Sequence, residues 1–363
     1  MLFFANPRSE YIYLKKKIDS KIKKVLNSNS YILGKEVEKF EKNFSDYLGV
    51  NYSVGVSNGT DAIILALQAI NIKKGDEIIT TSHTAFATIA AIVDVGAVPV
   101  FIDINENDFT IDVSKIENKI TKKTKAIIAV HIYGNPVDLK EILKIKKKFK
   151  IPLIEDCAQA HGAEYKNRKV GTFGDFATFS FYPTKNLSTY GDGGMVATNN
   201  NKIYKKIKLL REYGWKRKNF STQKGSNKRL DELHAGILSI KLAHLDKFNN
   251  KRISIAKKFL KKIKSKKLIL PNISLLKKHV FHLFVLRIKN NRRDDFLNYL
   301  KKRNIHAGIH YPLPNHLQKP FRKFNKTKLP VTEKISNEIV SIPNYPLLKS
   351  SEINKIIKVI NSF

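Results

Sequence analysis

The stretch IPLIEDCAQAHGAEYKNRKVGTFGDFATFSFYPTKNLSTYGDGG, residues 151–194, joins a buried strand to a lysine in a turn. It begins with an apolar run that ends in two carboxylates, Glu155 and Asp156. It ends with Ser180, Lys185 and a cluster of glycines. An acid delivered by a buried strand and a lysine among small and hydroxyl residues are therefore expected in one site.

This combination of residue types is the one that a pyridoxal phosphate site requires. A carboxylate keeps the pyridine nitrogen of the cofactor protonated, so that the ring can take up electrons, while a lysine forms the Schiff base and then moves protons. The rest of the chain is then expected to supply a phosphate site, a group that stacks on the ring and a substrate site.

Length and composition indicate a soluble protein. The 363 residues suggest one large domain with a smaller one, or two comparable domains. No stretch approaches the ~20 apolar residues of a membrane helix, and the first residues are too short for a signal peptide. A single cysteine, Cys157, excludes an intrachain disulfide and fits a reducing compartment. We expect a cytoplasmic protein that has no membrane partner.

The formal net charge of +36 raises the alternative of a basic nucleic-acid-binding regulator. However, the lysines are spread over the whole chain. In the predicted helix 256–267, for example, Phe259, Leu260 and Ile263 form an apolar stripe and lysines cover the remaining surface. This pattern favours solvated faces over a nucleic-acid footprint, and the positive field would attract an anionic substrate.

Strands and helices alternate through the first two thirds of the chain. Strands are expected at residues 53–56, 78–79, 126–130 and 152–155, with helices at 60–70, after 82 and at 139–149, and this βαβ pattern implies a parallel sheet. The pattern changes near residue 249. We expect a large α/β domain at residues 1–248, a smaller α+β domain at 249–363, and a long functional loop at 213–232.

A phosphate site is expected where the strand at 53–56 meets the next helix. Asn58 and Gly59 break the strand, and Thr60 and Asp61 open an amphipathic helix whose free N–H groups suit an anion. The alternative is an ordinary helix cap by Thr60 or Asp61.

Taken together, these segments resemble the DegT/DnrJ/EryC1/StrS group of nucleotide-sugar aminotransferases. The resemblance covers nearly the whole chain and rests on motifs in one order, YILGKEVEKFEKNF, SNGTDA, EDCAQAHGA, FSFYPTKN, GDGG, NKRLDE, HYPLP and SIPNYP. It implies the fold type I architecture of aspartate aminotransferase, with a mostly parallel central sheet, and pyridoxal 5'-phosphate as cofactor.

The resemblance also implies roles for single residues. Lys185 would bind the cofactor covalently and shuttle protons, Asp156 would pair with the pyridinium nitrogen, and Gln159 would contact the ring hydroxyl. Gly59, Thr60, Asp61 and Ser180 would hold the phosphate. Asn227 would reach the phosphate in a neighbouring subunit, so the active site would be shared within a homodimer.

The ring-stacking position departs from the pattern of many relatives, which read P-x-x-T-[FYW]-x-A-T. Here Ala85 stands at the aromatic position, and Phe86 is one step out of register. We therefore expect the imidazole of His83 to stack on the cofactor.

On the substrate side, the resemblance implies glutamate as amino donor and a keto sugar linked to a nucleoside diphosphate as acceptor. Candidates for binding the nucleotide are Arg229, His310, Tyr311 and His316, although each histidine could instead be structural. His279 and His282 are interpreted as sheet residues, and no metal site is expected. The motifs look closest to enzymes that convert dTDP-3-keto-6-deoxyhexoses to 3-amino sugars for surface polysaccharides or other glycans. The alternative is an enzyme acting on a 4-keto sugar linked to dTDP or UDP.

Two further enzyme classes fit less well. Sugar dehydratases of the same group carry histidine in place of the Schiff-base lysine, whereas Lys185 is present. A nicotinamide-dependent enzyme would need G-x-G-x-x-G between a strand and a helix, and the sequence has none.

Overall fold

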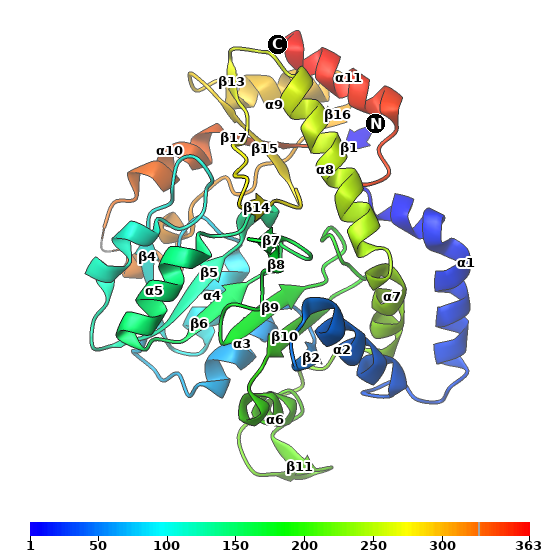
Figure 1. The fold of residues 1–363 in the computed structure, drawn as a ribbon, viewed down its shortest axis with the longest axis vertical. Coiled ribbons are helices and arrows are strands. Elements are labelled where there is room, and N and C mark those ends of the chain that lie inside the picture. Colours follow the sequence, from blue (N-terminus) through cyan, green and yellow to red (C-terminus); the bar gives the residue numbers. More distant parts are fainter. Residues whose placement is uncertain (326) are drawn as a thin grey trace.

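A seven-stranded sheet forms the centre of the molecule, seen here in a computed structural model that describes residues 1–325 and 327–363 (Figure 1). The strand order is β2-β10-β9-β6-β5-β3-β4, and only β10 runs antiparallel to its neighbours. Its strands are β2 (Tyr52–Val56), β3 (Glu77–Thr81), β4 (Val98–Ile102), β5 (Thr124–Val130), β6 (Leu153–Asp156), β9 (Phe176–Ser180) and β10 (Gly194–Thr198). The predicted α/β fold with a mostly parallel sheet is confirmed.

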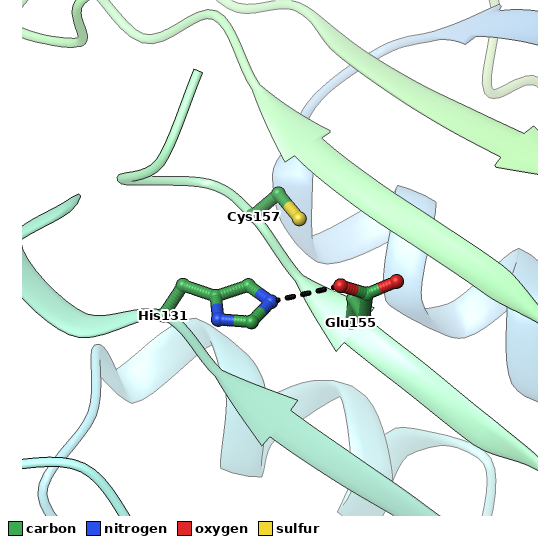
Figure 2. A group of neighbouring side chains, drawn as sticks. All are labelled: His131, Glu155 and Cys157. Atoms are coloured by element: carbon green, nitrogen blue, oxygen red, sulfur yellow. Dashed lines mark hydrogen bonds and ion pairs between the residues drawn. The ribbon is translucent and has the colours of Figure 1, made fainter. Parts of the chain in front are cut away.

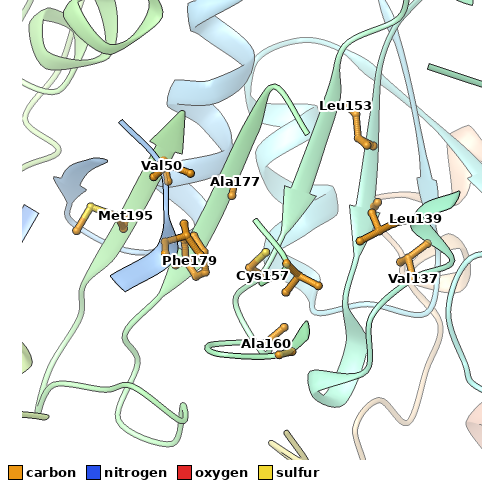
Figure 3. Packing of buried hydrophobic residues seen from close by; sticks show 14 of the residues in the cluster. Val50, Val137, Leu139, Leu153, Cys157, Ala160, Ala177, Phe179 and Met195 are labelled. Carbon is orange, nitrogen blue, oxygen red and sulfur yellow. The ribbon is translucent and has the colours of Figure 1, made fainter. Parts of the chain in front are cut away.

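Helices cover both faces of this sheet. One face packs against α2 (Lys35–Leu48), α5 (Leu139–Phe149) and α7 (Glu232–Leu242), and Figure 3 shows part of this layer around Phe179 and Met195. The other face packs against α3 (Gly59–Ala69), α4 (Phe86–Asp94) and α6 (Asn201–Leu210). Because β6 is buried on both faces, its residues are apolar up to the two carboxylates at its end.

The C-terminal part has its own core. The antiparallel sheet β13 (Leu268–Ile269), β15 (Phe284–Ile288) and β17 (Ile339–Ile342) packs with α8 (Leu245–Lys262), α9 (Arg293–Lys301) and α11 (Ser350–Asn361), and α10 (Pro330–Glu338) precedes β17. The first strand, β1 (Leu2–Phe3), pairs with β16 (Ile305–His306) of this part (Figure 1). The predicted boundary at 248/249 lies inside α8, and the division into two domains remains a prediction.

The remaining elements lie at the periphery. Helix α1 (Pro7–Leu26) contacts α7, and two short ladders are formed by β7 (Glu164–Tyr165), β8 (Arg168–Lys169) and β14 (Lys277–Lys278), and by β11 (Trp215–Arg217) and β12 (Phe220–Ser221). The expected loop at 213–232 thus contains a small hairpin. Among the described residues, none of the helices combines the length and the apolar character needed to cross a membrane.

Most predicted elements are found within a few residues of their expected positions. The helix at 139–149 matches α5 at both ends, because its apolar spacing and its cap, Asp138, are local signals. His279 and His282, which were interpreted as sheet residues, lie outside the sheet, because β15 begins only at Phe284. Phe281 has φ of +47°, a left-handed conformation that interrupts an extended strand. This irregular segment, residues 279–283, becomes important in the site.

Candidate active site

A cavity of about 430 Å³ opens at the carboxyl ends of β6 and β9, where parallel α/β sheets bind ligands. Of the predicted site residues, it brings together Gly59, Thr60, Asp156, Gln159, Ser180, Lys185, His310 and Tyr311. The other lining residues are Phe4, Asn58, Ile63, Ala85, Ala87, Thr88, Ala158, Tyr182, Thr184, Asp192, His282 and Leu283.

Lys185 lies in the segment that connects β9 to β10, and its N–H is hydrogen-bonded to the Tyr182 carbonyl at 2.9 Å. Burial lowers the pKa of Lys185 to about 8, and the nearby carboxylate of Asp156 opposes this shift only partly. The amine is therefore more easily deprotonated than that of a surface lysine, as a Schiff-base nucleophile must be.

Asp156 ends β6 and is held by two hydrogen bonds. The Thr88 hydroxyl donates to Oδ2 at 2.9 Å, and the Ala158 N–H donates to Oδ1 at 3.1 Å. Burial raises the pKa of Asp156 above its usual value, and these hydrogen bonds and Lys185 offset only part of the shift. An additional cation in the cavity would favour the ionised carboxylate.

The start of α3 approaches Ser180 closely. Asn58 is the helix cap and accepts a hydrogen bond from the Asp61 N–H at 2.8 Å, so the cap is neither Thr60 nor Asp61. A Cβ on Gly59 would lie 2.7 Å from the Ser180 Cβ, which explains the glycine. The N–H groups of Gly59 and Thr60 have no acceptor within the helix and are available to an anion.

Asp61 itself does not line the cavity. Its carboxylate contacts Ser57, Asn58 and Lys228, with the Asn58 Nδ2–Oδ2 distance at 3.0 Å. Since its N–H and carboxylate are both engaged, the structure does not bring Asp61 to the group of cavity-lining residues. Its part in phosphate binding remains a prediction.

Gln159 links two tyrosines across the cavity floor. Its Nε2 donates to the Tyr311 hydroxyl at 2.9 Å, and its Oε1 accepts from the Tyr133 N–H at 2.6 Å. The hydroxyl of Tyr133 donates in turn to the carbonyl of His310. Gln159, Tyr311 and His310 are thereby held as one unit at the edge of the cavity.

His83 and His316 do not line the cavity. His83 is 1% exposed, its Nε2 is 2.7 Å from the Tyr133 hydroxyl, and burial lowers its pKa to about 4. His316 is enclosed between Ser82, at 2.7 Å, and Glu333, at 3.2 Å. The space expected to receive the His83 ring is instead bordered by Ala85 and Ala87. The stacking role of His83 and the substrate role of His316 remain predictions without support from these positions.

Asn227 and Arg229 also lie outside the cavity. Asn227 is exposed in the loop that follows the β11–β12 hairpin, and Arg229 pairs with Glu212 at 3.5 Å and bridges to Val56 on the edge strand β2. Their proposed contacts therefore depend on another subunit or on a large substrate.

Among the lining residues that were not predicted as site residues are Phe4, Thr88, Tyr182 and His282. Tyr182 stands in the motif FSFYPTKN, and Thr88 stands at the last position of the P-x-x-T-[FYW]-x-A-T pattern, so the resemblance contained a signal for both. Phe4 reaches the cavity from the N-terminus, and His282 reaches it from the irregular segment before β15. No local pattern indicates either contact.

A second group of residues with possible metal-binding atoms includes both sequence neighbours of Asp156, but it is buried and does not line the cavity. His131, Glu155 and Cys157 have possible metal-binding atoms within 4.8 Å of one another (Figure 2). However, His131 Nε2 contacts Glu155 at 3.1 Å, its Nδ1 accepts the Val137 N–H at 3.0 Å, and burial raises the pKa of the Cys157 thiol. These atoms are occupied by structural hydrogen bonds or protonated, which leaves them poor metal ligands.

The residues of the cavity fit pyridoxal phosphate. The buried Lys185, whose pKa is lowered, suits the Schiff base, and the Asp156 carboxylate, which has no directly bonded cation, suits the pyridine nitrogen. The start of α3, where Gly59 allows close approach, suits the phosphate. Lys185, Asp156, Gly59, Thr60, Ser180 and Gln159 would hold the cofactor.

Comparisons with known proteins agree with this geometry. The model of the DegT/DnrJ/EryC1/StrS aminotransferase family matches residues 13–361. A dTDP-3-amino-3,6-dideoxy-alpha-D-galactopyranose transaminase of Aneurinibacillus thermoaerophilus is 44% identical over 363 residues, 100% of this chain and 99% of that protein. A dTDP-3-amino-3,4,6-trideoxy-alpha-D-glucose transaminase of Streptomyces venezuelae is 36% identical over 367 residues, 99% and 95% of the two chains.

Solved structures are similar over the same extent. DesV of Streptomyces venezuelae in complex with a ketimine intermediate has a TM-score of 0.96 at 36% identity, covering 99% of this chain and 98% of that chain. A DegT DnrJ EryC1 StrS aminotransferase from Brucella abortus has a TM-score of 0.95 at 30% identity, covering 100% and 99%.

Proposed function

Since the chain belongs to the DegT/DnrJ/EryC1/StrS family of pyridoxal-phosphate-dependent aminotransferases, we propose that it aminates a keto sugar carried by a nucleoside diphosphate. The observation that carries the proposal is the meeting of Lys185 and Asp156 in one cavity with the open start of α3. Two relatives that match this chain over nearly their whole length are named as dTDP-sugar transaminases.

The residues of the cavity have distinct tasks. When bound, pyridoxal phosphate supplies an electron sink conjugated to the reacting amine. Asp156 carries the negative charge that stabilises a protonated ring nitrogen. Lys185 would hold the cofactor through its amine, and as a free amine it would carry a proton at Nζ within the cavity. Because its pKa is lowered to about 8, far more of this amine is neutral near neutral pH than of an ordinary lysine.

The substrate that we propose is a dTDP-3-keto-6-deoxyhexose, with glutamate as amino donor and the 3-amino sugar as product. The support is the name of the relative that is 44% identical over the whole chain. The positive charge of the protein favours an anionic nucleotide, and the product would enter surface polysaccharide or glycan synthesis in the cytoplasm.

We propose in addition that two copies share each active site. Asn227 is exposed and does not line the cavity of its own chain, while Tyr31, Ile32, Tyr182, Tyr213 and Phe220 expose large apolar side chains. Mixing inactive Lys185→Ala protein with weakened Asn227→Ala protein tests this arrangement. Recovery of activity in the mixture, with a dimeric mass in solution, is expected; strictly additive activity contradicts it.

Absorbance spectroscopy tests the enzyme itself. Purified protein should show the visible absorbance of a lysine-bound cofactor, and Lys185→Ala should remove it while the protein still folds. Glutamate alone should bleach the absorbance, and addition of a dTDP-3-keto-6-deoxyhexose should restore it. Protein that gains no colour with added pyridoxal phosphate would refute the proposal. If only 4-keto sugars restore the absorbance, amination occurs at carbon 4 of the sugar and not at carbon 3.

A further inference from the structure

His282 lines the active-site cavity although it comes from the C-terminal part of the chain. It lies in the irregular segment before β15, and its side chain shares the cavity with Lys185, His310 and Tyr311. The residue is 6% exposed. Only one of its ring nitrogens, Nδ1, is hydrogen-bonded to a described residue, at 3.2 Å from the Asn186 Oδ1.

A chain of buried amides fixes which atom of that hydrogen bond is the donor. Asn249 Nδ2 donates to the His161 carbonyl at 2.8 Å, and a carbonyl can only accept, so Asn249 presents Oδ1 to its other neighbour. Asn186 Nδ2 donates to this Oδ1 at 2.8 Å and to the Val280 carbonyl at 3.3 Å. The remaining atom of the Asn186 amide, Oδ1, must accept, and therefore His282 Nδ1 carries a proton.

The other ring nitrogen is consequently a hydrogen-bond acceptor. Burial lowers the pKa of His282 well below its ordinary value, and the charges of Lys185 and Arg252 lower it further, so the ring is neutral and Nε2 carries a lone pair. Within the described part of the chain, Nε2 has no hydrogen-bond partner. It is also absent from the set of solvent-inaccessible side-chain atoms without a partner. The ring lines the cavity, and Nε2 is its nitrogen that is not used within the described part of the protein.

We propose that His282 Nε2 accepts a hydrogen bond from a sugar hydroxyl on a carbon next to the one that is aminated. This inference rests on the proposed function. His282 and Lys185 line the same cavity, and the charge of Lys185 acts on the His282 ring, so the imidazole lies near the lysine, beside which the reacting carbon must lie. A hydroxyl can donate to a bare Nε2, whereas the carboxylates of the amino donor cannot. His282 thus acts on the sugar half-reaction and determines specificity for a hydroxylated sugar.

Two substitutions of His282 distinguish the acceptor role of Nε2 from the structural hydrogen bond that Nδ1 makes with Asn186. In His282→Asn, the side-chain amide occupies the region of Nδ1 and can still donate to Asn186, but nothing replaces Nε2. In His282→Gln, the longer amide reaches the region of Nε2 and can supply an acceptor there. Both variants should retain cofactor colour and the glutamate half-reaction, which also shows that they fold.

The probes are dTDP-3-amino-3,6-dideoxy-α-D-galactose and its 2-deoxy and 4-deoxy analogues, reacted with cofactor-loaded protein in single turnovers. His282→Asn should slow the fully hydroxylated sugar by about 5- to 100-fold, the effect of leaving one buried donor unpaired. His282→Gln should recover part of this loss. One of the two deoxy sugars, the one lacking the partner hydroxyl, should be insensitive to both substitutions.

The outcomes distinguish this inference from the function on which it rests. An equal loss with all three sugars, or no loss with any, overturns the role of Nε2 alone. An equal loss in the glutamate half-reaction also overturns it, because it would assign His282 a purely structural role. If unmodified protein reacts with glutamate but with none of the three sugars, the proposed substrate is wrong, and this inference is refuted with it.

Discussion

Two adjacent carboxylates, Glu155 and Asp156, end the same strand in very different surroundings. Glu155 accepts four hydrogen bonds, from the N–H groups of Gly171, Phe173 and Gly174 at 2.7–2.8 Å and from His131 at 3.1 Å. Asp156 accepts two and faces the cavity. Burial favours a raised pKa in both carboxyl groups. In Glu155 the hydrogen bonds outweigh burial and the net pKa is lowered, whereas in Asp156 burial outweighs the hydrogen bonds and the net pKa is raised.

The difference shows how one strand end separates structure from chemistry. Successive side chains of a strand point to opposite faces, so neighbouring residues meet different environments. Glu155 is fully satisfied and closes the loop at residues 171–174 against the sheet. Asp156 is under-satisfied without a ligand, which suits a group that must bind a cation.

The largest expected effect comes from replacing Asp156. The Asp156→Asn variant keeps the side-chain shape but cannot neutralise a protonated ring nitrogen, so the glutamate half-reaction should slow by about 10³-fold. The free energy of unfolding of the cofactor-free protein should change by less than about 1 kcal/mol, because an under-satisfied charge is removed. Stopped-flow absorbance and urea unfolding measure the two quantities. A rate within tenfold of the unmodified protein would contradict the assigned role.

Glu155→Gln should reverse this profile. The amide can accept at only one end, which leaves backbone N–H groups of the 171–174 loop unpaired and lowers the free energy of unfolding by about 3 kcal/mol. Urea unfolding measures the loss, and the rate per folded molecule should stay within about threefold. The matched control is Glu164→Gln, which breaks a partly exposed pair with Lys278 and should cost less than about 1 kcal/mol. Equal losses in both variants would refute the comparison.

A smaller effect is expected from Thr88→Val, which removes one of the two hydrogen bonds to Asp156. The charged form of Asp156 becomes less favoured, and the glutamate half-reaction should slow by about tenfold, equivalent to about 1.4 kcal/mol. Thr80→Val serves as control, because its buried hydroxyl donates to the Ile128 carbonyl away from the cavity. It should lower stability without slowing the reaction, and a similar slowing in both variants would contradict the prediction.

The smallest expected effect is on the pH dependence of stability without cofactor. Because the pKa of Glu155 is lowered in the folded protein, Glu155 adds stability above about pH 4, and this stability is lost as the pH falls through the folded-state pKa. Because the pKa of Asp156 is raised, Asp156 adds stability below about pH 4, and this stability is lost as the pH rises through the folded-state pKa. Glu155→Gln should therefore reduce the loss of stability as the pH falls below about 4, and Asp156→Asn should reduce the loss as the pH rises above about 4. Urea unfolding between pH 3 and 7 tests both, and unchanged profiles would contradict the assigned environments.

Local signals predicted much of the fold and half of the site. The spacing of apolar residues predicted α5 and the parallel strands, because periodicity and capping act within one element. The cofactor pair, Lys185 and Asp156, follows from a buried strand end and from motif order, and the cavity contains both.

The sequence by itself determined the fold class, the family and the lysine–acid pair, because these depend on local pattern and on the order of motifs. Only the tertiary structure decided which side chains reach the cavity. Asp61, His83 and His316 are drawn into hydrogen bonds with other side chains, while Phe4 and His282 enter from distant parts of the chain. The sequence does not indicate which residues will surround a histidine in the folded protein. Packing between elements that are far apart fixes whether its nitrogens are occupied or face the substrate.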